Sequence, residues 1–316
     1  MKLRLIDGEI DVYDVLLLGD YFFDIIYTGL PEFPALGREI YSTSMTSTGG
    51  AMYITACALR RLGVQVGWVG QFGDDAYSQF VRDLAISENI DLTLARILDR
   101  PYRRVTTSMP LESDRAFVTF ADPDPSDWFE YWMQVIETAA YRHVHLGSLL
   151  CIDLAEPLIA AARQRGATIS MDCQDVPLLT QGCDWQRLLG LVDIFMPNAR
   201  EAKIIAKTDL VSDAIDIIRR WTPMLVIKDG SQGAWVAHGD DLINEPCICA
   251  GDVIDTTGAG DCFNAGFLYG YSVRDEDART AARYGNICGG MSVTGVGGAT
   301  NAPTHGQLEA WLMPSH

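Results

Sequence analysis

The feature that most constrains the fold is a regular alternation of short apolar segments with amphipathic segments. Apolar segments of strand length occur at 12–18, 65–69, 143–146, 168–171, 192–196 and 225–228, and segments of helical period occur at 50–62, 75–87, 154–163 and 213–219. Strands that alternate with helices form right-handed βαβ units. We therefore predict an α/β fold of three layers, with a mostly parallel sheet between helices, and with Asp74 as the N-cap of the helix at 75–87.

Two segments, 25–46 and 103–120, break this alternation. Each carries strand-like alternation without a helix, as in Ala116-Phe117-Val118-Thr119-Phe120. We expect them to pair into a small extra sheet beside the main one. Because an exposed apolar sheet needs cover, a ligand or a partner subunit is expected against it.

Composition narrows the class of protein. A formal net charge of −18 makes a basic nucleic-acid-binding face hard to build, and no run of 18 apolar residues predicts a membrane span. The eight cysteines show no zinc-site spacing, so we expect reduced, mostly buried thiols, with Cys247 and Cys249 on one strand. The N-terminal residues lack the pattern of a signal peptide, so we expect one cytoplasmic domain over residues 1–316.

The most informative segment is Gly258-Ala259-Gly260-Asp261, at the predicted start of a helix. Two glycines and an alanine leave the backbone uncovered where free N–H groups and the helix dipole attract an anion, which suits a phosphate. A carboxylate beside such a site can accept a proton from an attacking alcohol, and even a low-pKa carboxylate suffices as base in phosphoryl transfer. The alternative is a glycine-rich turn in which Asp261 only caps the helix.

Other phosphate-binding and hydrolytic motifs are missing. The chain has no GxxxxGK[ST] segment, no GxGxxG after the first strand and no GxSxG elbow. These absences argue against a P-loop protein, a nicotinamide dehydrogenase and a serine hydrolase.

Two further segments are compatible with a nucleotide. Asn198 and Glu201 open a helix and share a face, where Glu201 could hold the water shell of Mg²⁺; the alternative is a capping box. Lys228-Asp229-Gly230-Ser231-Gln232-Gly233 ends a strand, and Gly230 and Gly233 would let the backbone approach a nucleotide; the alternative is a hairpin turn.

Read together and in order, these segments resemble the signature of the ribokinase-like sugar kinases, the PfkB family. The motifs are Asn198-x-x-Glu201, Lys228-x-Gly230-x-x-Gly233 and Asp255-Thr256-Thr257-Gly258-Ala259-Gly260-Asp261. Gly49-Gly50 before the first helix, and Gly73-Asp74-Asp75 after Val69-Gly70, are similar to the family's N-terminal signatures. The resemblance covers nearly the whole chain and implies a ribokinase-like domain with a small β lid.

The resemblance also implies roles for individual residues. Asp261 would be the base and Gly258, Ala259 and Gly260 the anion hole. The nucleotide, ATP, would be held with Mg²⁺ by Asn198, Glu201, Lys228, Gly230, Gly233 and Asn286. Asp24, Gly49 and Gly50 would bind the acceptor. Asp255 and Thr257, with Ser292 and 297–301, would match a site for a monovalent cation such as K⁺, and the lid would serve as a homodimer surface.

The departures from the family pattern fall on the acceptor side. Ile54 stands where the family has an asparagine, Phe22 where it often has a polar group, and Asp172-Cys173-Gln174-Asp175 where DPN is usual. We predict phosphorylation of a primary hydroxyl of a sugar or sugar derivative. A nucleoside kinase, favoured by Phe22 and Ile54, and a non-catalytic sugar-binding regulator are the alternatives. Arg103, Arg104 and Arg115 lie in the lid and could meet the carboxylate of an acidic sugar.

Overall fold

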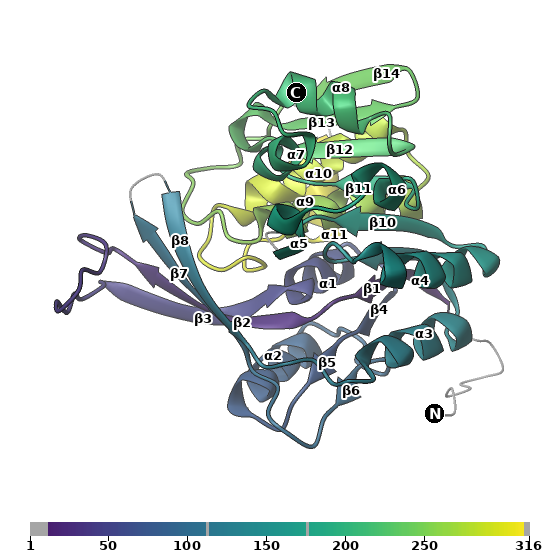
Figure 1. Cartoon of the computed structure of the whole chain (residues 1–316). Helices are drawn as coiled ribbons and strands as arrows, with labels where there is room; N and C mark the ends of the chain where they lie inside the picture. Colours follow the sequence, from purple (N-terminus) through teal and green to yellow (C-terminus); the bar gives the residue numbers. More distant parts are fainter. Residues whose placement is uncertain (1–11, 112–113, 175–176, 313–316) are drawn as a thin grey trace.

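The computed structural model describes residues 12–111, 114–174 and 177–312 and is built around an eight-stranded sheet (Figure 1). In spatial order its strands are β14 Asp241–Glu245, β13 Ala234–His238, β12 Met224–Lys228, β11 Ile194–Met196, β10 Thr168–Asp172, β9 Tyr141–Leu146, β1 Tyr13–Leu18 and β4 Val66–Val69. Neighbouring strands from β12 to β4 pair in parallel, and β13 and β14 add antiparallel pairs at one edge. The predicted, mostly parallel sheet is confirmed.

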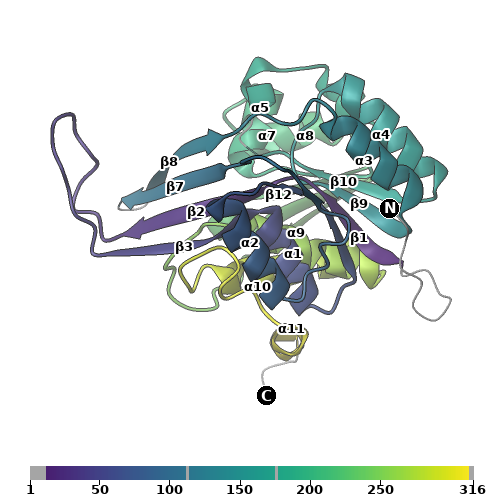
Figure 2. The ribbon, with the colours of Figure 1, turned by 90° about the horizontal axis from the view of Figure 1, so that it is seen from below.

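Helices cover both faces of this sheet (Figure 2). One layer contains α3 Trp128–Thr138, α4 Ile152–Gln164, α5 Pro177–Gln181, α6 Trp185–Leu189, α7 Ala199–Ala206 and α8 Val211–Ile218. The other contains α1 Met52–Arg61, α2 Ala76–Ser87, α9 Ala259–Leu268, α10 Ala278–Ser292 and α11 His305–Leu312. The three-layer prediction is therefore confirmed.

Strand β1 shows why the apolar segments lack the alternation of a half-exposed strand. Leu16 and Leu18 pack into the core under α3 and α4, whereas Val15 and Leu17 pack into the core under α1. Successive side chains of a strand point to opposite faces, so a strand covered on both faces must be apolar throughout.

A second sheet projects from one end of the main sheet (Figure 1, Figure 2). Its four strands, in order, are β3 Ser44–Ala51, β2 Tyr21–Thr28, β7 Arg104–Leu111 and β8 Asp114–Ala121. This sheet, called the lid below, confirms that the segments 25–46 and 103–120 pair. The strands differ from those bounds, since β2 begins at Tyr21 and β3 continues through Gly49 and Gly50. A short pair of strands, β5 Gln71–Phe72 and β6 Arg96–Ile97, lies beside α2 (Figure 1).

Several local predictions are wrong. The first helix starts at Met52 and not at Gly50, because Gly50 is still paired with Phe22 in the lid. The N-cap of α2 is Asp75 and not Asp74: its Oδ1 accepts hydrogen bonds from the N–H groups of Tyr77 and Ser78, each at 3.0 Å.

Only half of the eight cysteines are buried, namely Cys57, Cys173, Cys262 and Cys288, so the prediction that most are buried is not met. Cys247 and Cys249 lie beyond the end of β14 and are exposed, so the strand predicted for them is wrong. Across the described ranges, no helix combines the length and apolarity needed to cross a membrane.

Candidate active site

The turn before α9 is shaped by close contacts that only glycine permits. Gly258 has φ +70°, and a Cβ there would lie 2.6 Å from Cδ1 of Ile54 and 2.7 Å from Cα of Gly298. The next residues, Ala259 and Gly260, begin α9, whose N-terminal amides carry partial positive charge. This turn, 258–260, is called the anion turn below.

Asp261 lies in the first turn of α9, where it is half-buried. The hydroxyl of Thr55 on α1 donates to its Oδ1 at 3.5 Å. Burial raises the pKa of Asp261 to about 8, Asp172 adds to the rise, and Lys228 opposes it. At this carboxyl, the loss of water on burial outweighs the effect of the nearby cation on the pKa.

A buried polar cluster lies behind Asp261, formed by Asp172 at the end of β10, Lys228 at the end of β12 and Asn264 on α9. The Nζ of Lys228 is 2.9 Å from Oδ1 of Asp172 and donates to Oδ1 of Asn264 at 3.1 Å. The Nδ2 of Asn264 donates to the other oxygen of Asp172 at 2.7 Å. Burial alone would lower the pKa of Lys228, but Asp172 and Glu201 raise it, so the ammonium stays charged.

Asn264 was missed from the sequence. The signal that could have found it is its position three residues after Asp261, which places both side chains on one face of the helix. Lys228 was expected against the nucleotide; its ammonium lies in the buried cluster and near the anion turn, 3.6 Å from where a Cβ on Gly260 would be.

Asp24, Gly49 and Gly50 meet at the root of the lid. Asp24 on β2 lies over Gly50, so a Cβ on Gly50 would be 2.2 Å from Oδ2 of Asp24. A Cβ on Gly49 would overlap the ring of Tyr53 at 2.4 Å. Burial raises the pKa of Asp24 to about 7, and Asp255 contributes. Like-charge repulsion from Asp24 in turn contributes to the raised pKa of Asp261, so the two carboxyls lie within electrostatic reach of each other.

Asn198 and Glu201 form the capping box considered as the alternative. Oδ1 of Asn198 accepts from the Glu201 N–H at 2.9 Å, and Oε2 of Glu201 accepts from the Asn198 N–H at 2.8 Å. Glu201 is 5% exposed, and its charge helps to raise the pKa of Lys228. A carboxylate near Lys228 is nevertheless a ligand type that suits Mg²⁺ or its water shell.

Gly230, Gly233 and Asn286 surround the turn between β12 and β13. Gly230 has φ +53° and open space around its missing side chain, whereas a Cβ on Gly233 would lie 2.1 Å from the Glu245 carbonyl oxygen. Nδ2 of Asn286 donates to the carbonyls of Glu245 and Pro246 at 2.9 and 3.0 Å. Gly233 and Asn286 thus hold the chain that leaves β14, next to the open backbone at Gly230.

The two oxygens of Asp255 join two loops. Oδ1 accepts from the N–H and the hydroxyl of Thr257 at 2.9 and 2.7 Å, and Oδ2 accepts from the Gly297 N–H at 2.9 Å. Ser292 donates to the carbonyl of Gly289 at 2.9 Å. Within the described ranges there is no group of three His, Cys, Asp or Glu side chains arranged for a metal ion. A monovalent cation here would therefore depend on main-chain carbonyls.

The arginines of the lid are less available to bind an acidic substrate than the sequence suggested, because Arg103 and Arg104 already have acidic partners. The guanidinium of Arg104 is 3.0 Å from Asp20 and also contacts Asp124 and the hydroxyl of Tyr102. Arg103 pairs with Asp122 at 2.9 Å and covers the ring of Phe120. The side chain of Arg115 lies outside the described residues, although its backbone belongs to β8.

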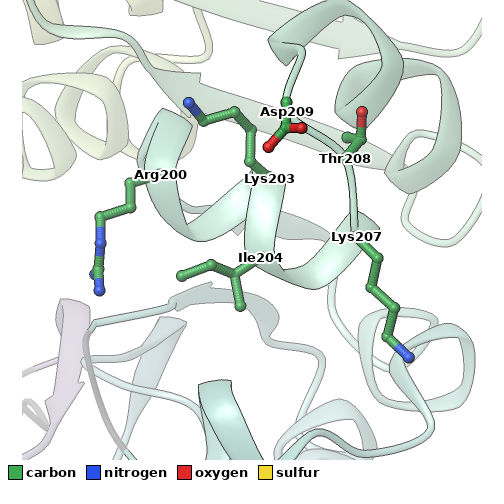
Figure 3. A pocket seen from close by; sticks show the side chains of 6 residues that line it. All are labelled: Arg200, Lys203, Ile204, Lys207, Thr208 and Asp209. Carbon is green, nitrogen blue, oxygen red and sulfur yellow. The ribbon is translucent and has the colours of Figure 1, made fainter.

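A separate pocket of about 400 Å³ lies on α7 and the turn after it (Figure 3). Its lining residues are Arg200, Lys203, Ile204, Lys207, Thr208 and Asp209. Figure 3 shows that Lys203 points away from Arg200 and Lys207, so the three cations do not converge on one ligand.

Comparisons with known proteins agree with this geometry. A family model described as pfkB family carbohydrate kinase matches residues 40–305. An ATP-dependent ribose-1-phosphate kinase of Halopiger xanaduensis is 29% identical over 90% of this chain and 92% of its own. A nucleoside kinase of Methanothermobacter thermautotrophicus is 28% identical over 93% and 94%. A putative ribokinase II from E. coli, solved with ATP and Mg²⁺, matches with a TM-score of 0.76 at 19% identity, covering 95% and 99%.

Proposed function

This chain belongs to the pfkB family of carbohydrate kinases, and we propose that it phosphorylates a primary hydroxyl of a sugar or sugar derivative, with Asp261 as the base. Family membership makes it a phosphotransferase that acts on an alcohol and uses ATP with Mg²⁺. The observation that carries the proposal is the position of Asp261 in the first turn of α9, beside the anion turn and within electrostatic reach of Asp24.

In the proposed reaction, Asp24 accepts hydrogen bonds from acceptor hydroxyls and holds the reacting oxygen toward Asp261. Asp261 takes the proton of that hydroxyl, and its pKa of about 8 lies near neutral pH, in the range that suits a general base. The backbone of Gly258, Ala259 and Gly260 would stabilise the charge that develops on the transferred group. Mg²⁺, when bound near Glu201, would neutralise phosphate charge.

The lid supports a sugar over a nucleoside. In the register of the lid strands, Asp24 lies opposite Thr48 on β3 and Thr106 on β7, and Thr106 lies opposite Thr119 on β8. These four polar side chains therefore lie in one row on one face of the lid. The hydroxyls of Thr106 and Thr119 are 3.1 Å apart. Such a row suits a ligand with several hydroxyls better than a flat base. Ile54, which favoured a nucleoside, is 1% exposed and packs against Gly258 and Gly298.

A charged acceptor is less favoured, since Arg103 and Arg104 already have acidic partners. A merely regulatory sugar-binding protein is disfavoured as well. Such a protein would have no use for a base whose pKa is raised by burial beside an intact Asp172–Lys228–Asn264 cluster.

The test is a coupled assay of ADP release over pentoses, hexoses, sugar phosphates, keto-acid sugars and nucleosides, with and without Mg²⁺. We expect turnover on a neutral sugar, and no turnover above background by Asp261→Asn. Efficient phosphorylation of a nucleoside and of no sugar would replace the sugar proposal. Acceptor binding without ADP release from any compound would favour the regulatory alternative.

Three further proposals concern the surroundings of the site. K⁺ would bind near Asp255 and Thr257 through carbonyls of 297–301, and kinetics with K⁺ against a tetraalkylammonium salt would test it. The exposed apolar residues of the lid would form a homodimer surface. The free exposed Cys151, Cys247 and Cys249 are typical of a reducing compartment, which supports the cytoplasm.

A further inference from the structure

The last residue of α1, Arg61, makes an unusual number of directed contacts. Its Nη1 donates to the carbonyls of Ala299, Thr300 and Ala302 at 2.7, 3.1 and 3.0 Å. Its Nε and Nη2 donate to the two oxygens of Glu88 at 3.0 and 2.6 Å. A planar guanidinium is suited to this double task, because it presents several donors in fixed directions.

Glu88 follows α2 as its C-cap residue and completes the arrangement. The side chains of Arg61 and Glu88 are 23% and 25% exposed, so the pair is largely removed from water. The guanidinium lowers the pKa of Glu88, which keeps that carboxylate charged. The pair thus fixes the direction in which Arg61 presents Nη1 to the three carbonyls.

The segment that Arg61 holds, 297–302, forms the wall behind the anion turn. Cα of Gly298 would be 2.7 Å from a Cβ on Gly258, which places the two backbones in direct contact. The Gly297 N–H donates to Asp255 at 2.9 Å, and the thiol of Cys262 donates to the Gly298 carbonyl at 3.3 Å. The segment therefore touches the residues before, within and after the anion turn.

We propose that Arg61, held by Glu88, is a positioning residue that sets the anion turn for phosphoryl transfer by clamping the segment 297–302. Arg61 does not itself touch the reacting atoms. Its effect runs through the carbonyls of 299–302 to Gly297 and Gly298, and from these to Asp255 and Gly258.

If Arg61 positions the anion turn, its removal should lower the rate of phosphoryl transfer more than the affinity for substrates. Donors aimed at developing charge act mainly in the transition state, and a displacement of about 1 Å can cost roughly 100-fold in rate. Loosening 297–302 is therefore expected to lower kcat while the KM of the acceptor and the Kd of ADP change little. The inference rests on the proposed function, since it presupposes phosphoryl transfer at the anion turn.

Arg60 provides a matched control, as a neighbouring arginine on the same helix turn. Its Nε and Nη1 donate to the carbonyls of Asn89 and Val64 at 3.1 and 2.6 Å, and it makes no bond to 297–302 among the residues that the structure describes. Arg60→Met removes an arginine with two carbonyl bonds, but leaves the clamp in place.

The experiment measures kcat, acceptor KM and melting temperature for the wild type, Arg61→Met, Arg61→Lys and Arg60→Met, below every melting point. We expect kcat to fall about 10- to 100-fold in Arg61→Met, with partial recovery in Arg61→Lys and nearly unchanged kcat in Arg60→Met. Equal kcat values for Arg61→Met and Arg60→Met would overturn the inference. Absence of turnover in the wild type on every acceptor would instead count against the proposed function.

Two measurements keep the test decisive if Arg61→Met does not fold. Glu88→Gln retains Arg61 but weakens its hold, and we expect a several-fold lower kcat; an unchanged kcat would overturn the inference. Calorimetry with ADP and with ADP plus aluminium fluoride, a mimic of the phosphoryl group in transfer, should show that Glu88→Gln weakens the second much more than the first. Equal losses for the two ligands would indicate a purely structural role and contradict the proposal.

Discussion

Two features of the surroundings of Asp261 change its pKa in opposite directions. The residue begins a helix beside backbone N–H groups that would favour its ionised form, yet burial and Asp172 raise its pKa to about 8. A carboxyl in this state can take a proton near neutral pH and release it again. The same property makes it a costly residue for the folded protein once it ionises.

We expect Asp261→Asn to lower kcat by roughly 10²–10⁴, because the acceptor hydroxyl loses its base. The affinity for ATP should stay within a few-fold of the wild type, since the amide preserves the shape of the site. Coupled ADP release gives kcat, and calorimetry gives the affinity. A variant with near-normal kcat would remove Asp261 from the mechanism.

The raised pKa also predicts a pH-dependent gain in stability for Asp261→Asn. In the unfolded chain this carboxyl ionises near pH 4, whereas in the folded protein it stays protonated up to about pH 8. Its stabilising contribution is therefore fully present below about pH 4 and is lost as the pH rises toward 8. Asparagine does not titrate, so the melting temperature of the variant should exceed that of the wild type by a margin that grows from pH 5 to pH 8.

Scanning calorimetry at several pH values measures this margin. Asp240→Asn, at an exposed position in a surface turn, provides the matched control for the loss of one carboxylate. A margin for Asp261→Asn that does not change with pH would contradict the raised pKa.

A substitution of Asp24 tests the part of the site proposed to bind the acceptor. Asp24→Ala should abolish use of the acceptor, because its carboxylate is the group at the lid root that can accept bonds from sugar hydroxyls. The affinity for ATP should hardly change. Calorimetry with each ligand separates the two effects, and a variant that loses ATP but keeps the acceptor would show that the acceptor pocket lies elsewhere.

At the scale of elements, the root of the lid contains a charged cluster around the buried Arg104. Arg104 begins β7, Asp20 precedes β2 and Asp124 follows β8, so the guanidinium joins the ends of three lid strands. Burial raises the pKa of Asp20 to about 6, although Arg104 lowers it in part.

We predict that Arg104→Met destabilises the protein by about 3–5 kcal/mol, because it leaves the largely buried carboxylate of Asp20 without its cation. Denaturant unfolding measures the loss. The double variant with Asp20→Asn should recover part of it, since one uncompensated charge is removed. Arg103→Met, at the exposed neighbouring position, should cost far less. Similar losses for the two arginines would contradict the assigned difference in burial.

At the scale of the whole molecule, the outer face of the lid exposes apolar side chains on a strongly acidic protein. Met45, Val118 and Phe120 are 56%, 62% and 51% exposed, and they share one face of the lid by strand register. A face of this kind is typical of a surface that a partner covers.

We therefore expect a homodimer at micromolar concentration that Val118→Lys converts to a monomer. Sedimentation velocity measures the state of each protein. Leu242→Lys, an equally large change at an exposed residue of β14, should leave the dimer intact. A wild-type protein that sediments as a monomer would contradict the predicted dimer.

The sequence alone determined the layered α/β fold, the lid and the glycine turn with its aspartate. Each of these features follows from a local sequence pattern. The patterns are apolar segments of strand length, segments of helical period, and glycines where the backbone must lie close to another chain segment. Where the predictions for α1 and α2 failed, they failed by one or two residues: the N-cap of α2 is Asp75, and α1 starts later than expected. The end of an element depends on individual hydrogen bonds, which the hydrophobic period does not specify.

Only the tertiary structure decided the pKa values of the site residues and the contacts that hold those residues in place. Asp172, Lys228 and Asn264 come from three distant segments, and their meeting depends on which strand ends adjoin α9. The pKa of Asp261 follows from loss of water in the folded core, which no local pattern records. In the same way, Arg104 became an internal ion-pair partner and Arg61 a clamp on 297–302, because folding brought their partners from far along the chain.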